Sequence, residues 1–111
     1  MKMVRSTIRM LIPLKNQNEA LEILGSMSEQ IQFDPGCISS RLYRSVDDEG
    51  TIMLEEIWTS EKDLQRHLRS EKYHKILLVV EMAAEPPEIR FDTITHSSGV
   101  ETIEQARTPT D

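Results

Sequence analysis

Three side chains that could carry out acid–base chemistry on an aromatic molecule lie close together in the sequence: Glu56, Trp58 and His67. An imidazole titrates near neutral pH, so His67 is a natural general base or hydrogen-bond partner. The carboxylate of Glu56 could orient His67 or act as an alternative base. The indole of Trp58 could stack on a planar ring and donate through its N–H. The combination predicts a small-molecule pocket, with His67 and Glu56 as candidate catalytic residues and Trp58 as a substrate-binding residue.

Other residues with chemical potential are weaker candidates. Tyr43 and Tyr73 could contact a substrate through their hydroxyl groups. Cys37 is the only cysteine, so an intramolecular disulfide is impossible, and we expect a buried structural thiol. His67 and His74 would lie about 10 Å apart on a continuous helix, whereas zinc ligands converge to about 2 Å from the ion. With no third ligand in view, we predict no metal site.

The same side chains also fit a purely structural interpretation. A tryptophan at the end of a strand is often a core residue, since aromatic side chains dominate core packing. His67 beside Leu64 and Leu68 could be a hydrogen-bonded residue at the core boundary. Glu56 lies on a mostly apolar face, so we expect it to have a hydrogen-bonding or charged partner.

The strands that would position these residues follow from hydrophobic periodicity. Alternation of apolar and polar residues predicts four strands, at 3–12, 37–45, 51–58 and 88–96. In the second strand we expect Ile38, Ser40 and Leu42 to share a face. In the third strand Glu56 and Trp58 fall on the same face, because side chains two residues apart point the same way.

Helical spacing predicts two helical regions between these strands. We expect Asn16 or Asn18 to cap the first region. Its apolar stripe consists of Ala20, Ile23, Leu24, Met27 and Ile31. The second region opens at Ser60, which forms a capping-box pattern with Asp63, and it carries His67. After Ser70 a further stripe follows, made of Tyr73, Ile76, Leu77 and Val80.

The predicted element order is β-α-β-β-α-β, which is typical of an α+β, ferredoxin-like fold with a four-stranded antiparallel sheet and helices on one face. We assign residues 1–96 to this domain and 97–111 to a polar C-terminal tail. The uncovered sheet face would carry a mixed set of side chains, which could be exposed or could pair with a second copy: Arg5, Arg9, Arg41, Tyr43, Met53, Ile57 and Ile94.

Composition and charge argue against two classes of partner. The chain has 111 residues and a formal net charge of −6, and its basic residues are interleaved with acidic ones, so we expect no nucleic-acid binding. The longest apolar run, residues 76–80, is too short to span a bilayer, so we expect no membrane association. Because no secretory signal opens the chain, the predicted location is the cytoplasm.

Four short segments occur in order along this frame: Pro-Gly-Cys-Ile, Leu-Tyr-Arg-Ser, Glu-x-Trp-x-Ser and His-Leu-x-Ser. Together they make residues 3–96 resemble the antibiotic biosynthesis monooxygenase family. The resemblance implies a homodimer in which two ferredoxin-like subunits form a dimeric α/β barrel. Characterised relatives include cofactor-free oxygenases that act on quinols or anthrone-like polyphenols, and haem-degrading enzymes.

The resemblance also bears on individual residues. It places Trp58 and His67 on the pocket-lining strand end and helix, and Glu56 at the acidic position of the same motif. The family's second histidine is replaced by Lys72, which argues against a mechanism with two imidazoles. Haem degradation is disfavoured, because Leu77 falls where that branch has its axial histidine, and residues 3–12 contain no matching asparagine.

The leading hypothesis is therefore a cytoplasmic homodimer that uses O2 to oxidise a planar aromatic of the quinol or polyphenol type. It would be a monooxygenase that needs neither cofactor nor metal, because the electron-rich substrate supplies the electrons. The alternative is a dimeric α/β barrel without catalytic activity, which binds a small molecule or has a structural role.

Overall fold

The computed structural model describes residues 2–109, which form eight elements along the chain: β1 (Met3–Leu11), α1 (Leu14–Ile31), β2 (Cys37–Arg44), β3 (Thr51–Trp58), α2 (Glu61–Leu68), α3 (Glu71–Val80), β4 (Glu88–Ile94) and α4 (Val100–Arg107). Met1, in the predicted 1–96 domain, and Thr110 and Asp111, in the predicted tail, lie outside the described residues. None of the helices within the described part is both long and apolar enough to cross a membrane.

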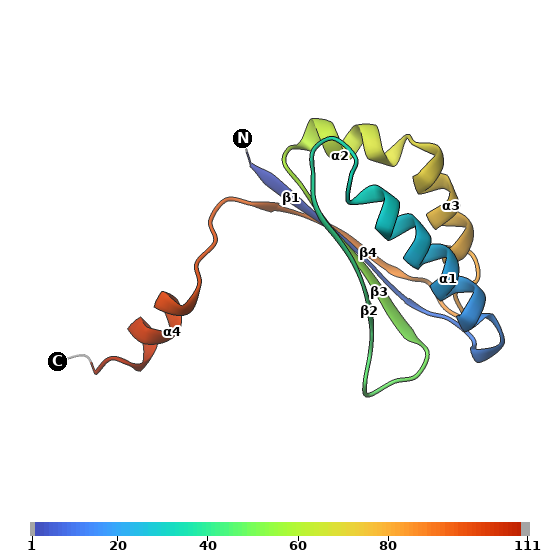
Figure 1. The fold of residues 1–111 in the computed structure, drawn as a ribbon. Helices are drawn as coiled ribbons and strands as arrows, with labels where there is room; N and C mark the ends of the chain where they lie inside the picture. The colour runs from blue at the N-terminus through green and yellow to red at the C-terminus, as the bar shows by residue number, and fades with distance from the viewer. Residues whose placement is uncertain (1, 110–111) are drawn as a thin grey trace.

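The four strands form one antiparallel sheet in the order β2-β3-β1-β4. Helices α1, α2 and α3 cover one face of this sheet and leave the other face bare, while α4 stands apart at the end of an extended segment (Figure 1). The structure confirms the predicted α+β ferredoxin-like fold, with the second helical region divided into α2 and α3. Assembly of two copies into a barrel stays a prediction.

The core lies between the sheet and the three covering helices. Burial alternates residue by residue along β1 and β3, as expected when one sheet face is covered. The buried side chains of these two strands are Val4, Ser6, Ile8, Met10, Ile52, Leu54, Glu56 and Trp58. Two central strands therefore supply most of the sheet side of the core, and a glutamate lies within it.

Helix α1 begins earlier than predicted. Its N-cap is Pro13, and neither Asn16 nor Asn18 caps it, so the asparagine prediction was wrong. Proline is tolerated at a helix start because the first N–H groups have no intrahelical partner. The buried Gln17 donates from Nε2 to the backbone oxygen of Glu49 over 2.6 Å. This bond fixes the start of α1 to the β2–β3 turn.

Strand β2 contains an irregularity that the alternation pattern did not predict. Its register against β3 shifts between Cys37 and Ser39, as in a β-bulge. Ile38 is left with an exposed fraction of 50%. Its predicted place beside Ser40 and Leu42 was therefore wrong, because alternation assumes a strand without an extra residue.

The second helical region breaks at Ser70, which caps α3 by accepting a hydrogen bond from the backbone N–H of Tyr73. The buried side of α3 is formed by Tyr73, Ile76 and Val79. Leu77 lies off this side and is 39% exposed, so its predicted place in the apolar stripe was wrong. The break changes the direction of the chain directly after the helix that carries His67.

Candidate active site

Strand β3 brings Glu56 and Trp58 to the covered face of the sheet, because both alternate with residues on the open face. The residues paired with Glu56 in the neighbouring strands are Ser6 on β1 and Ser40 on β2. Both neighbours are small, which leaves room for a long side chain between the sheet and the helices. Glu56 and Trp58 are each only 1% exposed.

Helix α2 positions His67 over these two residues. The helix starts at Ser60, whose hydroxyl accepts a hydrogen bond from the backbone N–H of Asp63, which confirms Ser60 as the cap. The carboxylate of Asp63 accepts from the Ser60 hydroxyl, which differs from the return bond to the backbone N–H in a full capping box. From this start the helical turn points Leu64 and His67 toward the sheet, and both are buried. The capping residues therefore determine where the imidazole lies.

Glu56, Trp58 and His67 form one buried cluster. The indole N–H of Trp58 donates to Oε1 of Glu56 over 3.3 Å. Nε2 of His67 lies 2.8 Å from the same oxygen, at ion-pair distance although the two groups are not aligned as a hydrogen bond. The rings of Trp58 and His67 are stacked with centroids 4.4 Å apart, and Tyr73 meets His67 edge-on at 5.1 Å. The predicted partner of Glu56 is thus His67 together with Trp58.

Two polar atoms of this cluster have no polar partner among the described residues: Oε2 of Glu56 and Nδ1 of His67. Buried polar atoms without partners are uncommon and often mark sites of function. With Nε2 facing the carboxylate, the natural neutral tautomer carries its proton on Nε2. Nδ1 then has a free lone pair, and a proton taken up there would form an imidazolium beside the carboxylate of Glu56.

A pocket of about 330 Å³ opens over the two stacked rings. It is lined by Asp34, Pro35, Trp58, Asp63, Arg66, His67, Ser70, Glu71 and Lys72. Its volume lies at the lower end of the range of small-molecule sites, about 300–1,000 Å³. Trp58 and His67 belong to its floor, since they are the buried members of the lining. The candidate base is therefore next to a space that a small ring could enter.

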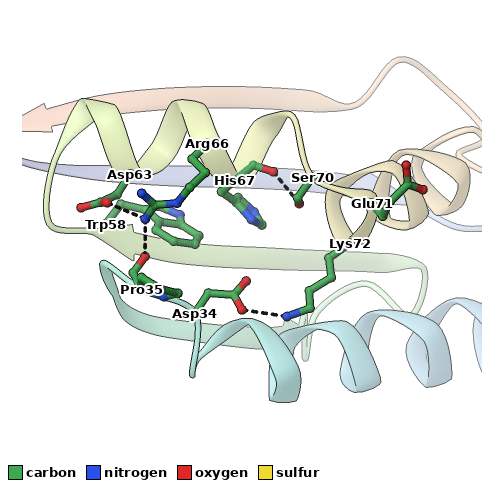
Figure 2. A pocket seen from close by; sticks show the side chains of 9 residues that line it. All are labelled: Asp34, Pro35, Trp58, Asp63, Arg66, His67, Ser70, Glu71 and Lys72. Atoms are coloured by element: carbon green, nitrogen blue, oxygen red, sulfur yellow. Dashed lines mark hydrogen bonds and ion pairs between the residues drawn. The ribbon is translucent and has the colours of Figure 1, made fainter.

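Two polar bridges cross the mouth of this pocket, and Figure 2 shows the rings of Trp58 and His67 between them. In one bridge, Lys72 Nζ lies 2.7 Å from Oδ1 of Asp34. In the other, Nη2 of Arg66 donates to the backbone oxygen of Pro35 over 2.9 Å. Both bridges join the α2–α3 region to the turn before β2, which holds the two sides of the mouth together.

The carboxylate of Glu56 affects the acidity of groups around it. Burial raises the pKa of the Tyr73 hydroxyl, and the nearby charge of Glu56 raises it further. Burial raises the pKa of the Cys37 thiol to about 11, with smaller contributions from the charges of Glu56 and Asp34. Cys37 is partly buried against the core and so is less covered than the expected buried structural thiol. A thiol with this pKa is a poor nucleophile at neutral pH.

Of the predicted substrate-binding residues, the structure brings Trp58 and Tyr73 to His67 but leaves Tyr43 elsewhere. Tyr43 is 40% exposed on β2, where it pairs with Met53 on the uncovered side of the sheet. The N–H of Trp58 is also already used by Glu56, so in this conformation it is not free to bind a substrate. Within the described residues, no group of three or more His, Cys, Asp or Glu side chains could hold a metal ion.

Sequence reasoning did not select the residues at the pocket mouth. In the sequence Lys72 stands out only as the replacement of the family's second histidine, and nothing near Asp34 marks it as a pocket residue. Their ion pair joins two segments that are far apart in the chain, and no local pattern indicates such a contact. One signal could have placed Arg66 near the pocket. Ser60 marks the start of α2, and Arg66 follows Asp63 by three residues and is hydrogen-bonded to its carboxylate.

A family model described as antibiotic biosynthesis monooxygenase matches residues 3–77. No protein of curated function matches the chain. Among solved structures, a protein from Mycobacterium tuberculosis is similar with a TM-score of 0.78 and 22% identity, over 87% of this chain and 99% of its own.

Two further solved structures show the same fold. A conserved protein from Methanosarcina mazei Go1 has a TM-score of 0.76 and 22% identity, over 83% of this chain and 92% of its own. A candidate antibiotic biosynthesis monooxygenase from Nitrosomonas europaea has a TM-score of 0.77 and 20% identity, over 87% of this chain and 94% of its own. At these identities the likeness concerns the fold alone.

Proposed function

Because the chain belongs to the antibiotic biosynthesis monooxygenase family, we propose that it oxidises an electron-rich aromatic of the quinol or polyphenol type with O2. The observation that carries this proposal is the buried Glu56–His67 pair, whose free nitrogen belongs to a ring at the floor of a pocket. In this proposal His67 is the general base, Glu56 orients the imidazole and stabilises its charged form, and Trp58 forms part of the pocket floor.

The proposed reaction needs no external electron donor. Nδ1 of His67 takes a proton from the phenol or from an activated ring CH2, which leaves an electron-rich carbanion or phenolate. This anion gives electrons to O2 and forms a carbon-bound peroxide, which takes back the proton. Loss of the second C–H proton and cleavage of the O–O bond then give a ring carbonyl and water. One O2 is consumed for each CH2 converted to C=O, and the substrate is the only reductant.

The environment of the pair supports such a role. A proton on His67 would lie beside a carboxylate from which water is excluded, where electrostatic interactions are stronger than in solution. Trp58 and Tyr73 enclose the imidazole with aromatic surface. A pocket of about 330 Å³ suits a compact ring system better than a large polycyclic one.

The proposal is tested by oxygen uptake with purified protein and a panel of hydroquinones and anthrone-type phenols. We expect uptake with at least one panel member, and a loss of about 10²- to 10⁴-fold in His67→Ala, the range typical of a general base. His74→Ala is the matched control, since His74 is exposed on α3. The absence of uptake with every compound, or equal rates in the two variants, would contradict the proposal.

A non-catalytic binding role is the second candidate, and one observation favours it. The only indole N–H at the pocket floor is bound to Glu56, and one face of the ring is stacked on His67, so the floor is already well packed. Calorimetry with the same panel separates the two functions. Binding that is lost in a Trp58→Ala variant, without oxygen uptake in the wild type, would identify a binding protein.

A further inference from the structure

Helix α4 packs against no other part of the fold. None of its residues is buried, and Val100 and Ile103, which share one side of the helix, are 65% and 59% exposed. Figure 1 shows it standing away from the sheet and the other helices. An isolated helix shorter than about 12–15 residues is marginal in water, and α4 has 8. The helix therefore needs an apolar surface that its own chain does not provide in this conformation.

The size of the molecule reflects this extended arm, residues 95–109. The radius of gyration is 16.4 Å, whereas a compact domain of this length has a value of about 13 Å. The match with the solved structure from Mycobacterium tuberculosis includes 99% of that protein but only 87% of this chain. The unmatched part is about the size of the arm, which points to an addition to the common fold.

A bare apolar strip lies on the helix side of β4. Ile89 and Phe91 are 42% and 46% exposed, although the residues paired with them in β1, Ile8 and Ser6, are 1% and 2% exposed. The covering layer of helices therefore ends between β1 and β4. Because β4 is also an edge strand, this strip lies along an unpaired side of the sheet, which proteins commonly cover with a helix or loop.

A hollow of about 390 Å³ continues the strip at the end of β4 where the arm begins. Thr93, which lies on the same side of the strand as Phe91, lines this hollow together with Val4, Ser60, Glu61 and the two lysines Lys2 and Lys62. Neither lysine forms an ion pair within the described chain. Two lysines without an ion-pair partner among the described residues therefore lie at the end of the apolar strip, next to one acidic residue, Glu61.

The charges of α4 complement this surface. Glu101 and Glu104 are exposed on the helix, next to the apolar side chains of Val100 and Ile103. We propose that α4 of one copy packs on the β4 strip of a second copy, with its glutamates beside Lys2 and Lys62 of that copy. Each copy has one arm and one strip, so a two-fold exchange occupies both, as in other isologous pairs. The proposal is independent of the proposed enzymatic function.

Cross-linking of two different variants tests this exchange in trans. In a Cys37→Ser background, one sample carries Phe91→Cys and a second carries Ile103→Cys. After mixing and mild oxidation, we expect a covalent dimer that contains one chain of each kind, identified by mass. Val46→Cys in place of Phe91→Cys is the matched control, because Val46 is 99% exposed in the β2–β3 turn. A yield no higher than that of the control would overturn the proposal, even if the protein dimerises through its open sheet face.

A charge-reversal pair provides a second test that does not depend on new cysteines. In sedimentation experiments we expect Glu104→Lys to raise the dimer dissociation constant by about two- to thirtyfold, because the two-fold dimer contains two copies of a partly exposed ion pair. Adding Lys62→Glu to the Glu104→Lys variant should bring the dissociation constant back toward the wild-type value. Both variants change surface residues, so folding should be intact. An unchanged dissociation constant in Glu104→Lys, or a wild type that is monomeric at all concentrations, would count against the exchange.

Discussion

The covered face of the sheet has an apolar end and a polar end, and both are equally buried. At the apolar end, Ile8, Met10, Ile52 and Leu54 are at most 2% exposed and belong to the hydrophobic core cluster. At the polar end, Ser6, Glu56 and His67 are 2%, 1% and 4% exposed. Strands β1 and β3 thus contribute both to a dry core and, together with α2, to a buried carboxylate–imidazole pair.

The comparison indicates what each end contributes. Replacing a buried ion pair by well-packed apolar residues is often neutral or stabilising, so the polar end is not needed for a stable fold. The apolar end already buries large side chains, each of which contributes about 1.5–3 kcal/mol. A polar cluster beneath a pocket is therefore best explained by chemistry or binding at that end, and the following experiments separate the two contributions.

Removing the carboxylate should give the largest effect on stability. In Glu56→Leu, the N–H of Trp58 and Nε2 of His67 lose their partner, and we expect the free energy of unfolding to fall by about 2–6 kcal/mol, because each buried donor left without a partner costs about 1–3 kcal/mol. Urea denaturation followed by circular dichroism measures the change. Glu55→Leu is the matched control on the open face of the same strand. If the two variants were equally stable, the cluster would not be an interacting unit.

A truncation at the apolar end should reduce stability without loss of activity. Leu54→Ala leaves a cavity between the sheet and α1, and we expect a loss of about 2–5 kcal/mol in the free energy of unfolding. At a temperature well below unfolding, the rate of oxygen uptake should stay within about twofold of the wild type. A large fall in rate with the fold intact would show that the two ends are not separate in function.

The reactivity of Cys37 reports the charge at the polar end. With its pKa raised to about 11, the thiol has about 100-fold less thiolate at pH 8.5 than a free cysteine, partly offset by greater nucleophilicity. We therefore expect alkylation by iodoacetamide to be about tenfold slower than for a model thiol. In Glu56→Gln one of the contributing charges is lost, so alkylation should become faster. A slower reaction in this variant would contradict a negative charge on Glu56.

The smallest effect is expected at the helix start below the pocket mouth. Hydrogen bonds from Thr59, Ser60 and Arg66 hold the pKa of Asp63 below its ordinary value. The folded state then binds fewer protons than the unfolded state, so the stabilisation is complete above the unfolded pKa of about 3.9 and is lost as the pH falls through the folded pKa. In acid titrations, the free energy of unfolding of Asp63→Asn should fall less steeply below about pH 4 than that of the wild type. Identical acid profiles would remove Asp63 as a contributor.

Much of the fold could be predicted from the sequence because its signals are local. The alternation of β1 and β3 placed Glu56 and Trp58 on the covered face, and Ser60 with Asp63 marked the start of α2. The bulge at Ile38 and the exposed side of Leu77 were missed, since each depends on how an element packs against its neighbours. The bridge between Asp34 and Lys72 was missed for the same reason. Tyr43 was selected by residue type, although the alternation of β2 had already placed it on the uncovered face of the sheet, away from His67.

The proposed chemistry requires that Nδ1 of His67 carries no proton while Nε2 faces Glu56, and NMR can measure which ring nitrogen is protonated. Long-range ¹H–¹⁵N correlation spectra of labelled protein distinguish the two neutral tautomers, and His67→Ala assigns the signals among the three histidines of the chain. We predict a proton on Nε2 and none on Nδ1. The signal of Nδ1 should shift when a quinol binds next to it. A proton on Nδ1 with a bare Nε2 would mean that the proposed base is already occupied, and His67 could not act through Nδ1.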